Sequence, residues 1–171
     1  EDAAKHGERQ LNVVVSVLVD LTQDLRVKRY GLIAGDPPRF TAYDESQRES
    51  LRDSLQRVFA RMVEHDMAIY VLPHIDAGGK VYEWRNWVDF DPLAEHEGYS
   101  YSSLVLNTIA EALAKTVQPT THVELSLSGE MGTSLFKHPA AYRQIVRDLK
   151  SKPELNDLKV GARARVEAID G

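Results

Sequence analysis

The sequence predicts an α/β fold: an incomplete, roughly half (β/α)8 barrel of the TIM type with parallel strands. Three observations lead to this prediction. Strand-like runs alternate along the chain with amphipathic helical patterns, which is typical of a parallel sheet covered by helices. The strand-like runs are nearly continuous in apolar residues, as in strands buried on both faces. The 171 residues are too few for a complete barrel, which takes about 250 residues.

Runs rich in apolar and β-branched residues mark the predicted strands. They lie at 11–20, 29–35, 67–76, 121–128 and 158–166. The run at 29–35 is the shortest and weakest of these. It is followed by D-P-P-R-F at 36–40, a sequence typical of a turn.

Helical patterns lie between the strands. The first helix is predicted to begin at Asp44, a good N-cap with Gln47 in capping-box spacing, and to end near 65–66. The second covers 99–117, and the third begins at Pro139, which suits the first turn of a helix. Each pattern has one apolar face. We therefore expect the helices to pack on the outer face of the sheet.

The composition is that of an ordinary globular domain, with 43% hydrophobic and 27% charged residues. We expect a polar lead-in at 1–10 and a single domain at 11–171. The net charge of -5 and the lack of a basic stripe argue against nucleic acid as a partner. No apolar run reaches the roughly 18 residues of a membrane span. There is no cysteine, which excludes disulfides, zinc–thiolate sites and thiol catalysis.

Cofactor motifs are absent from the sequence. No G-x-G-x-x-G follows the first strand and no phosphate-binding P-loop is found, so we predict no cofactor. His74 and Asp76 have an H-x-D spacing that could provide two metal ligands. Such a pair without further ligands is a weak signal, and we predict no metal site. A metal-dependent hydrolase built on these two residues and Glu130 stays open as an alternative.

Polar residues gather where the long predicted strands end. Asp20 ends the first strand, and His74 and Asp76 end the strand at 67–76. Glu130 follows the strand after that. The carboxyl ends of the strands in such a barrel meet at one face, which holds the active site. In the simpler interpretation, Asp20 caps a turn and Glu130 is a turn residue in a glycine-rich loop.

The loop after the second long strand combines aromatic and charged residues. Trp84 and Trp87 flank Arg85 in W-R-N-W. Sugar sites use aromatic rings against the apolar faces of a sugar and polar groups for its hydroxyls. The two tryptophans could equally be the core of the loop. In S-G-E-M-G, glycines on both sides of Glu130 leave room for a bulky ring beside its carboxylate.

These motifs, in this order, resemble those of the clan A glycoside hydrolases, especially the small barrel families of the β-mannanase type. The resemblance spans roughly residues 67–165. It is carried by V-L-P-H-I-D, W-R-N-W-V-D-F-D-P, Y-S-S-L-V-L-N-T-I-A-E-A-L-A, V-E-L-S-L-S-G-E-M-G and A-Y-R-Q-I-V-R-D-L-K.

The resemblance implies a retaining glycoside hydrolase in which Glu130 is the general acid/base that follows the fourth strand. Many members have Asn directly before this acid, whereas here it is Gly129. The usual hydrogen bond to the sugar 2-hydroxyl would then come from elsewhere. A general acid of this kind works from a partly buried position beside a second carboxylate. We expect such an environment for Glu130.

The resemblance also implies an oligosaccharide or polysaccharide substrate and a periplasmic or secreted location. The expected substrate-binding residues are Asp20, His74, Asp76, Trp84, Arg85 and Trp87.

In the enzymes that the sequence resembles, the nucleophile follows the seventh strand, and this sequence ends near the fifth predicted one. None of its acidic residues is a convincing substitute. We therefore expect an open barrel whose exposed edges and apolar face favour association with the missing half or with a second copy. The alternative function is a non-catalytic carbohydrate-binding or scaffold protein with the same fold.

Overall fold

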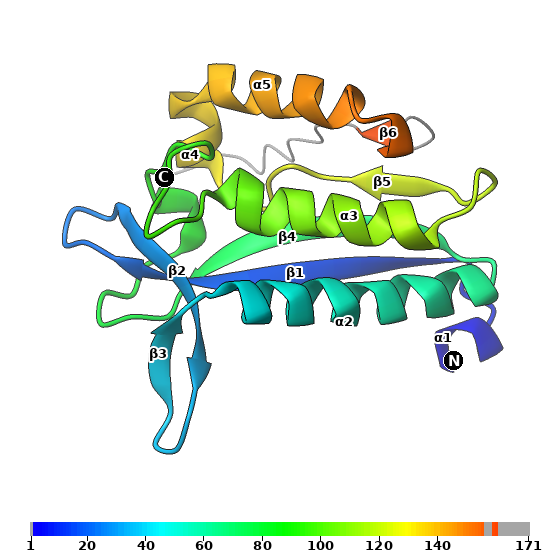
Figure 1. Ribbon diagram of the computed structural model, residues 1–171, viewed down its shortest axis with the longest axis horizontal. Coiled ribbons are helices and arrows are strands. Elements are labelled where there is room, and N and C mark those ends of the chain that lie inside the picture. The colour runs from blue at the N-terminus through cyan, green and yellow to red at the C-terminus, as the bar shows by residue number, and fades with distance from the viewer. Residues whose placement is uncertain (1, 156–158, 161–171) are drawn as a thin grey trace.

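The computed structural model describes residues 2–155 and 159–160. The chain forms one six-stranded sheet with the strand order β3-β2-β1-β4-β5-β6 (Figure 1). The strands are β1 (Gln10–Leu21), β2 (Val27–Ala34), β3 (Arg39–Ala42), β4 (Ala68–Ala77), β5 (Val123–Leu125) and β6 (Lys159–Val160). The helices are α1 (Asp2–Lys5), α2 (Glu45–Glu64), α3 (Asn107–Thr116), α4 (Gly132–Lys137) and α5 (Pro139–Lys150). Short 3-10 helices lie at Arg85–Trp87 and Pro153–Leu155, and a π-helical segment at Ser102–Leu106.

The four strands β1, β4, β5 and β6 are parallel neighbours, which confirms the predicted parallel sheet. Val13 of β1 lies opposite Val71 of β4, and Ile69 of β4 lies opposite Val123 of β5. The strand expected at 121–128 is shorter than predicted. Of the strand expected at 158–166, only β6 falls within the described residues.

The weak run at 29–35 does not belong to the parallel set. Its strand, β2, pairs antiparallel with the end of β1 and with β3, and the resulting ribbon projects from the body of the molecule (Figure 1). The turn is shorter than the predicted range 36–40, because Arg39 and Phe40 already belong to β3 and pair with β2. As a consequence, Glu130 follows the third parallel strand of the described chain, not the fourth.

The helices follow the predicted start signals. At the start of α2, Asp44 Oδ1 accepts the backbone N–H of Gln47, and Gln47 Oε1 accepts that of Asp44, both at 2.9 Å. This reciprocal pair is the predicted capping box. Helix α5 begins at Pro139 as expected. None of the helices in the described part of the chain has the length and hydrophobicity that a membrane span requires.

The polar lead-in begins with one helical turn, α1, whose Ala3 packs against the hydrophobic core. The last residue of the predicted lead-in, Gln10, already belongs to β1.

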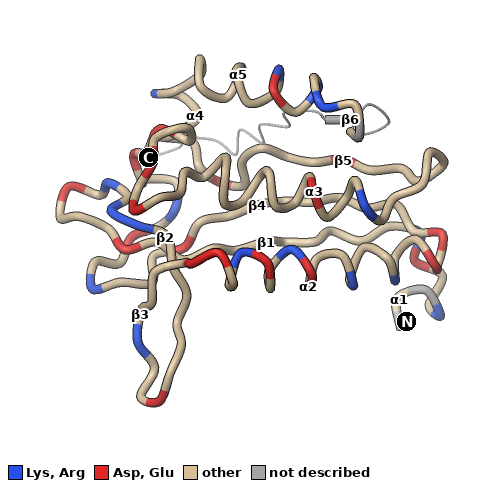
Figure 2. Tube along the Cα trace, in the orientation of Figure 1, with Lys and Arg blue, Asp and Glu red and all other residues tan. Residues whose placement is uncertain are grey.

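The helices cover only one face of the sheet. Burial alternates along β1: Val15, Val17 and Val19 are buried, whereas Val14 and Ser16 are exposed on the other face. The prediction that this strand is buried on both faces was therefore wrong. Charged residues lie along α2 and around the loops, while most of β1 carries none (Figure 2).

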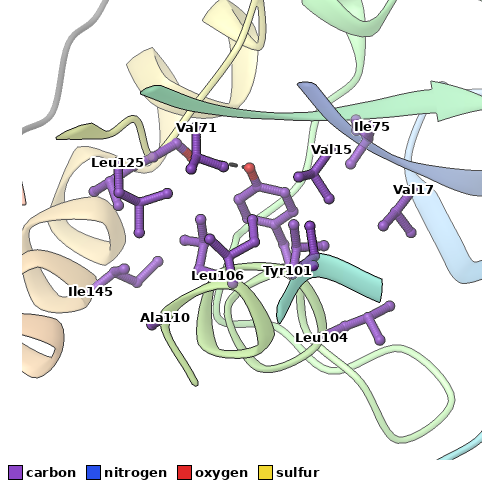
Figure 3. Packing of buried hydrophobic residues seen from close by; sticks show 14 of the residues in the cluster. Val15, Val17, Val71, Ile75, Tyr101, Leu104, Leu106, Ala110, Leu125 and Ile145 are labelled. Atoms are coloured by element: carbon purple, nitrogen blue, oxygen red, sulfur yellow. Dashed lines mark hydrogen bonds between the residues drawn. The ribbon is translucent and has the colours of Figure 1, made fainter. Parts of the chain in front are cut away.

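The covered face forms the core of the protein. Side chains of β1 and β4 pack there against the π-helical segment, α3 and α5 (Figure 3). The residues labelled in that view are Val15, Val17, Val71, Ile75, Tyr101, Leu104, Leu106, Ala110, Leu125 and Ile145. Because alternate residues of a strand point to opposite faces, His74 and Asp76 lie on the uncovered face.

Candidate functional site

One guanidinium joins two carboxylates at the carboxyl end of β4. Arg85 Nε and Nη2 both donate to Asp76 Oδ1, at 3.0 and 2.6 Å, and Nε also lies 3.3 Å from the carbonyl oxygen of Ile75. Its Nη1 donates to Glu130 Oε2 at 2.5 Å. The structure therefore brings together three of the predicted site residues, which come from three separate segments of the chain.

His74 lies beside this cluster, with its ring packed on the backbone of Gly129. A Cβ built at Gly129 would overlap His74 Cδ2 and Nε2 and would lie 3.0 Å from Leu72 Cγ. His74 Nε2 is buried and has no hydrogen-bond partner among the described residues. Burial lowers the pKa of His74, and the charge of Arg85 lowers it further, against the opposing effect of the nearby carboxylates. His74 is therefore neutral at neutral pH.

Glu130 has an unusual backbone conformation, with φ = 54° in the left-handed region. Few residues other than glycine adopt this conformation, and it persists where the surrounding structure holds it. On one side, the N–H of Gly129 donates to the carbonyl oxygen of Pro73 at 3.0 Å. On the other, the N–H of Gly132 donates to Asn86 Oδ1 at 2.7 Å. These two contacts fix the direction in which Glu130 projects.

The side chain of Glu130 is more open than expected. It is 45% exposed, so the expected partial burial is only modest. A second carboxylate, that of Asp76, contacts the same Arg85 guanidinium as Glu130. In this arrangement Glu130 is a hydrogen-bond acceptor.

The two tryptophans are surface residues, which decides against the interpretation that they form the core of the loop. Trp84 is 47% exposed and Trp87 is 56% exposed, and they flank Arg85 in the chain. Two exposed aromatic residues thus stand close in the chain to a residue of the charged cluster. Such a combination can present both apolar surface and hydrogen-bonding groups to a ligand.

Asp20 lies at the end of β1, but its carboxylate has other partners. Asp20 Oδ2 is 3.2 Å from Arg29 Nη2 and 3.9 Å from Lys28 Nζ on β2. The backbone at Gly79 is close enough that a Cβ there would overlap Asp20 Oδ1. These contacts do not join Asp20 to the Arg85 cluster. Its role in sugar binding stays a prediction.

Two supporting residues were missed by the sequence reasoning. Asn86 holds the segment after Glu130 through Gly132, and its only signal was its position within W-R-N-W. Tyr101 is fully buried, and its hydroxyl donates to the carbonyl oxygen of Leu127 at 3.1 Å (Figure 3). This bond anchors the segment that leads from β5 to Glu130.

Within residues 2–155 and 159–160, no group of three or more His, Cys, Asp and Glu side chains is arranged to hold a metal ion. Between Asp76 and Glu130, the position that a cation would take is filled by the guanidinium of Arg85.

Comparisons with known proteins support the fold. No family model matches the chain, and no similar curated protein is found. A solved structure described as the complex structure of a GH113 β-1,4-mannanase is similar, with a TM-score of 0.51 and 11% sequence identity. The similarity covers 97% of this chain and 49% of the mannanase chain. The chain thus spans about half the length of that enzyme and shares its fold over this part.

Proposed function

We propose that the chain contributes to the active site of a retaining glycoside hydrolase, with Glu130 as the general acid/base. The observation that carries the proposal is the Asp76–Arg85–Glu130 cluster where the parallel strands end, with two exposed tryptophans flanking Arg85 in the chain. In a retaining mechanism, Glu130 would first protonate the glycosidic oxygen of the leaving group. The resulting carboxylate would then take a proton from the water that attacks the glycosyl-enzyme.

The contact between Arg85 and Glu130 must open for this chemistry, because a general acid holds a proton. The Glu130 side chain is 45% exposed and that of Arg85 is 21% exposed, so solvent reaches this ion pair mainly from the Glu130 side. An arriving sugar hydroxyl would approach from that side and take the place of Arg85 on Glu130. Arg85 stays attached to Asp76 through two of its nitrogens and so remains at the site.

The other residues of the site would bind the substrate. Trp84 and Trp87 would pack on apolar sugar faces, while Asp76 and neutral His74 would bind hydroxyls. The similarity to a β-1,4-mannanase makes β-1,4-linked manno-oligosaccharides the first substrates to test. Polysaccharides with this linkage are degraded outside the cytoplasm, so the proposal extends to a periplasmic or secreted location.

The nucleophile would come from outside the described residues. Retaining enzymes place the two carboxylates about 5–5.5 Å apart, with the nucleophile free to attack. Asp76 Oδ1 already accepts two N–H groups of Arg85, which suits a residue that binds hydroxyls.

A non-catalytic carbohydrate-binding protein is the second candidate. The Arg85–Glu130 ion pair favours it, because a binding site can keep this pair permanently closed.

Incubation with β-1,4-manno-oligosaccharides and with a dinitrophenyl β-mannoside separates the candidates. For the enzyme, Glu130→Gln should lower cleavage of the oligosaccharide by about 10²–10⁴-fold, because the leaving group no longer receives a proton. The dinitrophenyl substrate needs no proton, and added azide should restore its turnover with retained configuration. Binding without cleavage by a protein that also supplies the nucleophile would support the second candidate. Neither binding nor cleavage would reject both.

A further inference from the structure

Helix α4 and the residue after it are bonded to the loop that directly follows Arg85. The bonds join Gly132 to Asn86 at 2.7 Å, Ser134 to Phe90 at 2.7 Å, and Lys137 and His138 to Asp89 at 3.1 and 3.0 Å. We call residues 86–90 and 132–138, joined by these bonds, the clasp. Because Arg85 directly precedes one side of the clasp and Glu130 lies two residues before the other, the clasp holds their backbones at a fixed separation.

Ser134 forms the most buried bond of the clasp. It is 0% exposed, whereas the side chain of Lys137 is 59% exposed. Ser134 Oγ has one hydrogen, which it donates to the carbonyl oxygen of Phe90. The hydroxyl of Tyr142, 2.9 Å away on α5, must therefore donate to Ser134 Oγ. Burial raises the pKa of Tyr142, so this hydroxyl keeps its proton at neutral pH.

A buried hydrogen bond holds a segment more firmly than an exposed ion pair does. Exposed pairs contribute little because water and salt screen them, while breaking a buried bond leaves polar groups unpaired. In Ser134→Ala, the carbonyl oxygen of Phe90 and the hydroxyl of Tyr142 would both lose this partner. We therefore expect Ser134 to contribute most to the clasp.

The proposed reaction needs the clasp because the contact between Arg85 and Glu130 opens when a sugar arrives. Once open, this ion pair no longer holds the Glu130 carboxylate. Glu130 also has a φ of 54°, a conformation that persists only where the surrounding structure holds it. A misplacement of about 1 Å at a reacting group can lower a rate by about 10²-fold.

We propose that Ser134 is a positioning residue for the reaction. It holds α4 on the loop that carries Arg85, and so keeps the Glu130 carboxylate where it can reach the glycosidic oxygen. Because Ser134 is fully buried, it acts through the backbone that leads back to Glu130 and not by touching the sugar. The inference rests on the proposed function.

Amide hydrogen exchange tests the clasp in the chain itself. The N–H of Gly132 reports on the clasp, and the N–H of Ile69, which is hydrogen-bonded within the sheet, reports on unfolding of the whole domain. In Ser134→Ala, exchange at Gly132 should quicken by about 2–10-fold relative to Ile69, the factor expected for one hydrogen bond. Tyr142→Phe is the matched control, because it removes a bond to Ser134 but leaves the bond between Ser134 and Phe90. It should leave the ratio unchanged.

Two substrates separate positioning from folding damage in a protein that also supplies the nucleophile. Ser134→Ala should lower cleavage of β-1,4-manno-oligosaccharides by up to about 10²-fold. The first burst of dinitrophenol from a dinitrophenyl β-mannoside needs no proton from Glu130, so its rate should be kept. Tyr142→Phe should retain both activities. Asp89→Ala, which removes the contacts at the exposed end of the clasp, is the second variant if Ser134→Ala does not fold, and it should shift both readouts in the same direction by a smaller factor.

Three results would overturn the proposal: equal exchange ratios in Ser134→Ala and Tyr142→Phe, unaltered oligosaccharide cleavage by Ser134→Ala, or an equal loss on both substrates. A parent protein that cleaves neither substrate would reject the proposed function and with it the role of Ser134. The two failures are distinguishable, because the exchange measurement needs no activity.

Discussion

The contact between Gly129 and His74 allows a direct test of how the Glu130 segment is held. In the variant Gly129→Ala, the added methyl group would overlap Cδ2 and Nε2 of the His74 ring and lie 3.0 Å from Leu72 Cγ. Neither the His74 ring nor the backbone of Gly129 can move away easily, because Gly129 and the facing edge of the ring are both buried. The methyl group must therefore displace either the ring or the segment that carries Glu130.

The expected cost follows from this crowding. Inserting a methyl group into a packed site typically lowers the free energy of unfolding by about 1–3 kcal/mol. For a chain of this size, each 1 kcal/mol lowers Tm by about 2–4 °C. In a His74→Ala background the ring is gone, and only the contact with Leu72 Cγ at 3.0 Å remains. There, Gly129→Ala should cost less than about 1 kcal/mol, giving a coupling within the range of about 0.5–3 kcal/mol found for contacting residues.

Urea denaturation of the four proteins in this double-mutant cycle measures the coupling. If Gly129→Ala lowers the free energy of unfolding equally in both backgrounds, to within about 0.5 kcal/mol, then the two residues do not touch as described. The packing of the Glu130 segment would then need another explanation.

Three further predictions concern the same site. The folded-state pKa of His74 is lowered, so as the pH falls the unfolded chain takes up a proton at this residue before the folded chain does. His74 therefore contributes stability above about pH 6.5 that is lost as the pH falls. In urea titrations at several pH values, His74→Gln should lose less stability on acidification than the unaltered chain, and an identical pH profile would contradict the pKa shift. Asn86→Ala leaves the N–H of Gly132 without its acceptor, so stability should fall by about 1 kcal/mol and exchange of the Gly132 amide should quicken; unchanged exchange would show that the bond is not maintained in solution. Glu130→Gly and Glu130→Ala both lose the contact with Arg85, but only glycine adopts a positive φ freely; the glycine variant should be more stable by about 1 kcal/mol, and equal stabilities would argue against the left-handed conformation.

The parallel core could be predicted from the sequence because its signals are local. Runs of β-branched residues mark β1 and β4, and the capping box at Asp44 marks the start of α2. The uncovered face could not be predicted in this way. Valine occupies both faces of β1, so the sequence shows no alternation even though burial alternates. Which face is covered depends on where the helices pack, and this is a property of the whole fold.

The residues of the candidate site could likewise be predicted where their signals are local, but their contacts across the fold could not. His74, Asp76 and Glu130 could be found because each lies at or just after a strand end, and Arg85 because it follows in an unusual aromatic loop. The partner of Asp20 could not be foreseen, since it depends on the register in which β2 folds back on β1.

The most direct test of the carbohydrate site uses the tryptophans. The chain has only two, and both flank Arg85, so the whole tryptophan emission reports on this site. Titration with mannohexaose should change the emission in a saturable manner. Arg85→Ala, which removes the link between Asp76 and Glu130, should weaken or abolish the response. Emission that stays constant up to millimolar mannohexaose, or a response that Arg85→Ala leaves unaltered, would contradict the placement of the site.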